Sequence, residues 1–235
     1  CGHSVVCLIS LSMLLPQLYA LPSLQRSAIQ LGEAKKLVMD GKYAEAEASV
    51  RALMSRQPSP DGFDLLGTIY EQQRKLNQAE EAYGQAVKLN PANHYSKTRL
   101  GIVYGKNGKY ADCVGVLEKL PQNIQDNPEA LFYLCRAYLE TGNRARALET
   151  AAVLEHLGGK DAGALLSVGR LLVSKDLNQQ AVPMLKNAVN LMPKSSEAHY
   201  SLAFALFKLH RYDEMSTYLD QAQNLDPTAP RILLL

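Results

Sequence analysis

The sequence predicts an all-α fold made of stacked antiparallel helix–turn–helix repeats, and two observations carry this prediction. The 235-residue chain aligns on itself at a spacing of 33 or 34 residues, which is the signature of a repeat architecture. Within each aligned segment, apolar residues recur at intervals of three and four over two stretches of about a dozen residues, so each segment predicts two amphipathic helices. The segments begin at Ser27, Pro60, His94, Pro128, Ala162 and Ser196.

The composition agrees with a folded protein that forms a core, and it disfavours several kinds of partner. Hydrophobic residues make up 47% of the chain, which argues against disorder and collagen. With 25 basic and 23 acidic residues the net charge is +2, and no polybasic tract is present, so we expect no nucleic-acid partner. The four cysteines show no CxxC spacing, which argues against a redox, zinc or haem site.

The first element along the chain is residues 1–25, a segment without Lys, Arg, Asp or Glu. Its apolar run Val5–Leu15 has the length of a signal-peptide hydrophobic region and is shorter than the ~20 residues that span a bilayer. Ala20 is a plausible last residue before cleavage. Three interpretations stay open: a cleaved signal peptide, an uncleaved membrane anchor, and a buried helix packed on the first repeat. We therefore expect an exported protein, periplasmic or extracellular, or a membrane-anchored one if the leader is retained.

Each repeat then places small residues where its two helices must approach closely, because a bulky side chain there would push them apart. The eighth place holds Ala34, Gly67, Gly101, Cys135, Gly169 and Ala203. The twentieth place holds Ala46, Ala79, Cys113, Ala147, Ala181 and Met215. Glycines that allow the chain to reverse direction fall between the two helices at Gly41, Gly108 and Gly142. Prolines that end the second helix stand at Pro58, Pro91, Pro193 and Pro227.

The pattern resembles the tetratricopeptide repeat family over Ser27 to Pro227. The second copy carries the signature almost whole, with Phe63, Leu66, Gly67, Tyr70, Ala79, Tyr83, Ala86 and Pro91. The resemblance implies six repeats in a right-handed superhelical solenoid, whose concave side is lined by the first helix of each pair. Copies three and four lack the terminal proline, and we expect Pro121 and Gly158-Gly159 to cut their second helices differently.

The concave side is the predicted binding surface, and places 2, 5, 9 and 12 of each first helix point toward it. This lining is more apolar than a free surface, which marks a site for a protein or peptide segment. Arg136 and Arg170 stand one repeat apart as partners for a carboxylate or a backbone carbonyl. The alternatives are that a terminal helix or the leader fills the groove, or that a further repeat covers its end. The predicted partner-binding residues are Tyr95, Thr98, Ile102, Phe132, Arg136, Leu139, Leu166, Arg170, Tyr200 and Phe204.

The sequence shows no pattern typical of catalysis. No two of the five histidines stand at the i,i+4 spacing of a helical metal pair, and neither a phosphate-binding glycine loop nor a GxSxG elbow is present. We therefore expect no enzyme activity, no cofactor and no metal. The clamp that part of the family uses for acidic C-terminal peptides is also missing, since the ninth places of copies one to three are Lys35, Thr68 and Ile102.

Residues 228–235 read as the opening of another first helix, and four apolar residues follow Arg231. Since a solenoid needs a polar cap to stay soluble, we expect a further repeat or a capping helix, and a sequence that is a fragment. Self-association through Leu206, Phe207 and Ile232–Leu235 is an alternative use of this end.

The predicted function is a non-enzymatic scaffold that holds a partner segment in its concave groove, in the assembly of an exported or envelope complex. The alternative is the recognition arm of a larger enzyme whose catalytic domain lies outside this sequence.

We expect Cys113 and Cys135 to be buried free thiols, with a disulfide between them as the less favoured alternative.

Overall fold

The computed structural model describes residues 23–121, 127–157 and 161–228. Over these ranges the chain forms α-helices joined by short turns and contains no strand, so the all-α prediction is confirmed. The predictions for residues 1–22 and 229–235, including leader cleavage and the further repeat, lie outside the described residues. None of the described helices is both long enough and apolar enough to cross a membrane.

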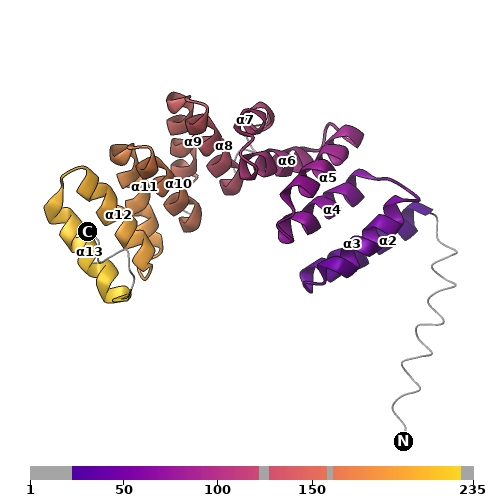
Figure 1. Cartoon of the computed structure of the whole chain (residues 1–235), viewed down its shortest axis with the longest axis horizontal. Helices are drawn as coiled ribbons and strands as arrows, with labels where there is room; N and C mark the ends of the chain where they lie inside the picture. Colours follow the sequence, from indigo (N-terminus) through magenta and orange to yellow (C-terminus); the bar gives the residue numbers. More distant parts are fainter. Residues whose placement is uncertain (1–22, 122–126, 158–160, 229–235) are drawn as a thin grey trace, which may run out of the picture. The chain divides into compact units, whose positions relative to one another are not determined.

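The described helices follow one another as antiparallel pairs (Figure 1). They are α2 (Ser23–Met39), α3 (Tyr43–Met54), α4 (Pro60–Gln72), α5 (Leu76–Leu89), α6 (His94–Lys106), α7 (Tyr110–Leu117), α8 (Pro128–Glu140), α9 (Arg144–His156), α10 (Ala162–Ser174), α11 (Asn178–Leu191), α12 (Ser196–Lys208) and α13 (Tyr212–Leu225). From α4 onward, the first helix of each pair begins at the residue that the repeat alignment gives. The first pair differs, because α2 begins at Ser23 and so includes three residues that the sequence assigned to the leader.

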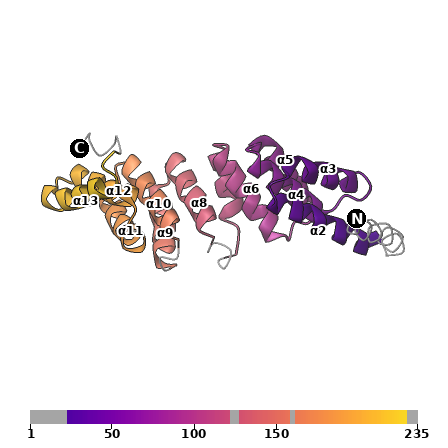
Figure 2. The ribbon, with the colours of Figure 1, turned by 90° about the horizontal axis from the view of Figure 1, so that it is seen from below.

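The chain divides into two compact units, residues 1–96 and residues 97–235, with the boundary inside α6. In the second unit, α10 contacts both α8 and α12, so these three first helices lie side by side (Figure 2). A continuous apolar core runs through this unit from Ile102 to Leu206.

Side-chain caps mark where first helices begin. At α4, Ser59 Oγ accepts a hydrogen bond from the Gly62 amide at 3.2 Å, which satisfies an N–H that the helix itself leaves unpaired. Asn127, Asp161 and Ser195 cap α8, α10 and α12 in the same way. Pro60 and Pro128 occupy the first helical position, where the missing N–H of proline costs nothing.

The turns within the pairs share one geometry, with a single residue in the left-handed region. The glycines predicted for this role, Gly41, Gly108 and Gly142, have φ values of 74° to 83°. The other three turns use Arg74, Asp176 and His210, with φ of 56° to 59°. The sequence did not indicate these three residues, because a non-glycine residue in this conformation leaves no compositional signal.

The two helices of a pair approach so closely that the eighth place tolerates only a small residue. A Cβ atom added to Gly67 would lie 2.6 Å from the ring of Tyr83 in the first unit. In the second unit, a Cβ on Gly169 would lie 2.6 Å from a methyl group of Leu185. Real Cβ atoms do not approach other atoms this closely, so glycine is required by the packing of the pair.

Cys113 and Cys135 are free, buried thiols, so the alternative of a disulfide between them is wrong. Each points at a backbone carbonyl of a neighbouring helix: Cys113 Sγ lies 3.7 Å from the Tyr133 oxygen and Cys135 Sγ 3.4 Å from the Ala147 oxygen. Burial raises the pKa of both thiols to about 12, because the charged thiolate is poorly solvated there.

Candidate functional site

The structure separates the ten predicted groove residues into exposed and buried groups. Tyr95 lies in the first unit with 53% of its surface exposed, and Arg170 is exposed in the second. Phe132, Arg136, Leu139, Tyr200 and Phe204 are half-buried.

Thr98, Ile102 and Leu166 are buried, and Ile102 and Leu166 belong to the apolar core of the second unit, so the assignment of these three residues to an open groove surface is corrected. Ile102 is completely covered, and Leu166 is only 7% exposed. For Leu166 the physical reason is that α10 packs beside α8 and α12, so an apolar residue at this place contacts neighbouring helices instead of solvent, while Ile102 is part of the same apolar core.

A shallow pocket of about 450 Å³ lies between α8 and α10, within the second unit. Three of the predicted groove residues, Phe132, Arg136 and Arg170, line it. The sequence did not indicate the other lining residues, which stand at the sixth, tenth, thirteenth and fourteenth places of their repeats. These residues are Glu140, Ser167, Leu171, Ser174 and Lys175.

The pocket carries three cationic side chains and one carboxylate. Two of the cations are neutralised within the protein: Arg170 forms an ion pair with Glu197 of α12, and Lys175 Nζ lies 2.9 Å from Glu140 Oε2. Glu140 and Lys175 carry opposite charges and stand about one repeat apart in the sequence. This spacing is the sequence signal that could have identified their side of the pocket.

Arg136 is the exception among the pocket cations. Its guanidinium lies over the ring of Tyr110, 5.7 Å from the ring centroid, and it has no carboxylate partner among the described residues. A half-buried guanidinium that is not neutralised favours an anionic ligand, because it offers a planar set of donors to a carboxylate.

The first helix of the last described pair, α12, carries several aromatic side chains that are at least partly exposed. Tyr200 and Phe204 stack with their ring centroids 6.4 Å apart and their planes 11° apart. Phe207 and Tyr212 meet edge to face at 6.2 Å, and Tyr212 is 52% exposed. Exposed aromatic rings of this kind are typical anchor sites for a partner protein.

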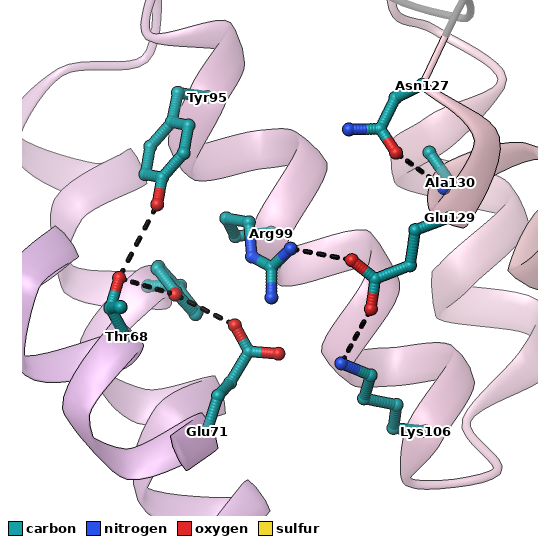
Figure 3. Close-up of polar contacts among 9 residues, drawn as sticks. Thr68, Glu71, Tyr95, Arg99, Lys106, Asn127, Glu129 and Ala130 are labelled. Atoms are coloured by element: carbon teal, nitrogen blue, oxygen red, sulfur yellow. Dashed lines mark hydrogen bonds and ion pairs between the residues drawn. The ribbon is translucent and has the colours of Figure 1, made fainter. Parts of the chain in front are cut away.

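Other groove-facing polar groups are engaged inside the protein (Figure 3). In the first unit, Thr68 Oγ1 lies 3.4 Å from Tyr95 Oη. In the second unit, Arg99 and Lys106 each lie 2.8 Å from a different carboxylate oxygen of Glu129. Burial alone would raise the pKa of Glu129, but the hydrogen bond from Lys106 and the charge of Arg99 hold it below its ordinary value. We interpret Glu129 as a structural link between α6 and α8.

The described residues offer no cluster of three or more His, Cys, Asp or Glu side chains that could hold a metal ion. What the second unit does offer is a pocket with one uncompensated guanidinium, and an aromatic surface two helices away on α12. This combination suits binding of a polypeptide segment by charge and apolar contact.

Comparison with known proteins agrees with this geometry. Models of the tetratricopeptide repeat match residues 60–93 and residues 173–235. The BBSome complex member bbs-4 of Caenorhabditis elegans is 22% identical over 205 residues, which is 83% of this chain and 44% of that protein. The chain therefore spans less than half the length of this relative.

Two solved structures show the same fold. PilW, described as a widely conserved type IV pilus biogenesis factor, is 15% identical with a TM-score of 0.75 over 89% of this chain and 97% of its own. YrrB, described as a TPR protein with an unusual peptide-binding site, is 15% identical with a TM-score of 0.59 over 78% of this chain and 95% of its own. Together with the two model matches, these likenesses identify the chain as a tetratricopeptide repeat protein.

Proposed function

We propose that the second unit binds an extended segment of a partner protein along α8, α10 and α12, with a carboxylate of that segment in the α8–α10 pocket. The observation that carries the proposal is Arg136, whose charge no described carboxylate neutralises. The repeat fold supports the coarser statement, since tetratricopeptide repeats are protein-interaction scaffolds.

The apolar part of the segment contacts the aromatic surface of α12. Phe132 lies beside the pocket, and Tyr200 and Phe204 continue the surface toward the C-terminal end of the unit. Burial of such side chains supplies most of the binding free energy, while the charge pair fixes the register of the segment.

We further propose that the scaffold serves the assembly of an exported or envelope complex, with the N-terminal segment as a signal peptide or membrane anchor. The charge-free residues 1–25 support this, and PilW is a pilus biogenesis factor of the same fold. In the alternative proposal, the recognition arm of a larger enzyme, the same groove captures the substrate protein.

Selection from a random peptide library against the full chain tests the groove. We expect the selected peptides to carry an Asp or Glu, or to depend on a free C-terminal carboxylate, next to an apolar residue. Arg136→Gln should weaken their binding by roughly 10- to 100-fold, because a charge-assisted hydrogen bond is worth about 1.5–3 kcal/mol.

Arg146→Gln is the matched control, since Arg146 is an exposed arginine on α9 that pairs with Glu149 outside the pocket. It should leave binding unchanged. Peptides that bind Arg136→Gln as tightly as the parent protein would refute the pocket assignment.

A further inference from the structure

Successive first helices contact each other through polar side chains at fixed places of the repeat. In the first unit, Thr68 Oγ1 at the ninth place of α4 lies 3.4 Å from Tyr95 Oη at the second place of α6. In the second unit, Arg170 at the ninth place of α10 forms an ion pair with Glu197 at the second place of α12. The ninth place of one first helix therefore meets the second place of the next.

A glutamate at the second place binds a cation of the preceding first helix in two contacts of the second unit. Glu129, in the first turn of α8, pairs with Arg99 and Lys106 of α6 (Figure 3). Glu197, in the first turn of α12, pairs with Arg170 of α10. Each carboxylate thus links the start of one first helix to the helix before it.

The contact between α8 and α10 has the arginine but a glycine in place of the glutamate. Arg136 stands at the ninth place of α8, as Arg170 does in α10, and the second place of α10 is Gly163. Because Gly163 has no side chain to offer, the Arg136 guanidinium lies over the ring of Tyr110 in the preceding pair. A cation–π contact does not occupy N–H donors in hydrogen bonds, so the donors of Arg136 can still bind a carboxylate.

Neither packing nor backbone conformation requires a glycine at position 163. The nearest atom to a Cβ added there is Asp161 Oδ1, at 3.3 Å, whereas a Cβ on Gly169 of the same helix would lie 2.6 Å from the Leu185 side chain. Gly163 has a helical backbone without a positive φ. Since glycine lowers the stability of a helix relative to other residues, the fold gives no reason for it here.

Gly163 lies at the edge of the α8–α10 pocket. Its carbonyl oxygen accepts a hydrogen bond from Ser167 Oγ at 2.8 Å, and Ser167 lines the pocket one turn further along α10. The two nearby carboxylates are engaged within the protein. Asp161 Oδ1 accepts from the Ala164 amide at 2.9 Å as the helix cap, and Glu140 pairs with Lys175 at the far end of α10.

We propose that Gly163 determines the specificity of this pocket, because it leaves the carboxylate place beside Arg136 for the ligand to fill. A carboxylate of the bound segment then lies against the first turn of α10, as Glu129 and Glu197 lie in the first turns of α8 and α12. This inference rests on the proposed function, since it names the part of the pocket that the ligand carboxylate occupies.

Gly163→Glu supplies the missing carboxylate and tests the proposal in the full chain. The introduced side chain should pair with Arg136, as Glu197 does with Arg170, and compete with the ligand. Gly163→Gln is the matched control, since it has the same size and a similar helix propensity without the charge. We expect Gly163→Glu to bind the acidic peptides of the library selection about fivefold more weakly than Gly163→Gln, because an exposed ion pair shifts an equilibrium by up to about that factor.

Two modified peptides identify the source of the ligand carboxylate. One carries a C-terminal amide, and the other carries Gln or Asn in place of its Glu or Asp. The modification that makes Gly163→Glu and Gly163→Gln bind equally identifies the group that lies beside Arg136. A difference between the two variants that persists when both groups are neutralised would overturn the proposal, because the introduced charge would then act on something other than a ligand carboxylate.

A measurement without any ligand separates this proposal from the proposed function. The carboxyl group introduced by Gly163→Glu should titrate below its ordinary pKa of about 4.3, and adding Arg136→Gln should raise that pKa, as followed by carboxyl NMR signals. A pKa that does not respond to Arg136→Gln would overturn the proposal. Peptides that bind both Gly163 variants equally but lose affinity in Arg136→Gln would also overturn it, and would leave the proposed function standing.

Discussion

Asp64 of α4 is a buried carboxylate whose two oxygens differ in their surroundings. Oδ2 accepts hydrogen bonds from Ser96 Oγ at 3.0 Å and from Asn93 Nδ2 at 3.1 Å, whereas Oδ1 is buried and has no hydrogen-bond partner among the described residues. Burial raises the pKa of Asp64, and the two hydrogen bonds only partly oppose it. The ionised form of Asp64 therefore destabilises the folded first unit.

The sign of the pH dependence follows from this pKa. Because the pKa of Asp64 is higher in the folded than in the unfolded protein, the side chain stabilises the fold most below the unfolded pKa of about 3.9, and this contribution is lost as the pH rises through the folded pKa. We expect Asp64→Asn to be more stable relative to the parent protein at pH 7 than at pH 4. Urea unfolding at the two pH values measures the difference.

Asp40→Asn serves as the control, because Asp40 is exposed in the same unit. A stability difference between parent and Asp64→Asn that stays the same at both pH values would show that the carboxylate is not the cause.

At the scale of single residues, the repeat period predicted the small and apolar core positions. It did not predict which polar residues are buried or adopt the left-handed conformation. A small residue stands at the eighth place of every copy, and at Gly67, Gly101 and Gly169 the close contact with the paired helix requires glycine, so the place leaves a periodic signal. Asp64 is a single buried carboxylate, and the left-handed residue of the turn is glycine in only three of the six pairs, so residue type does not reveal either role.

At the scale of elements, the close packing of two paired helices is what stabilises each repeat. Gly169→Ala should destabilise the second unit by about 1–3 kcal/mol, because the new Cβ meets the Leu185 side chain at 2.6 Å and forces α10 and α11 apart. The midpoint of urea unfolding checks this expectation.

Gly115→Ala provides the opposite case in the same unit. Gly115 lies inside α7 with no atom within 4 Å of an added Cβ, so alanine should stabilise the helix by about 0.5–1 kcal/mol. Equal effects of the two substitutions would mean that helix propensity, and not the approach of the paired helices, determines the outcome.

Helix boundaries were predictable where a cap or proline fixes them and less so elsewhere. From the sequence we expect Pro121 to end the second helix of the third copy, but α7 already ends at Leu117. The pocket was predicted only in part, because its edge is made by residues that face the adjacent first helix, and that packing depends on the side-by-side arrangement of α8 and α10.

At the scale of the whole molecule, stability should vary along the chain, because each repeat contacts mainly its neighbours. Residues 27–39 of α2 bury only Leu31 and Ala34, whereas α10 and α11 lie inside the apolar core of the second unit. We expect hydrogen–deuterium exchange to be fastest in the two terminal described helices, α2 and α13, where α13 buries only Ala222, and slowest in α10 and α11, by orders of magnitude. Uniform exchange over all described helices would instead indicate a single cooperative unit.

The burial of the two thiols in the second unit affects how readily the protein is oxidised. With a pKa of about 12, only on the order of one thiol in 10⁵ is ionised at neutral pH, and the thiolate is the form that oxidants attack. Burial and the raised pKa therefore slow the oxidation of Cys113 and Cys135 as long as the molecule is folded. An oxidised Cys135 in a purified sample would record that the molecule had unfolded at some earlier time.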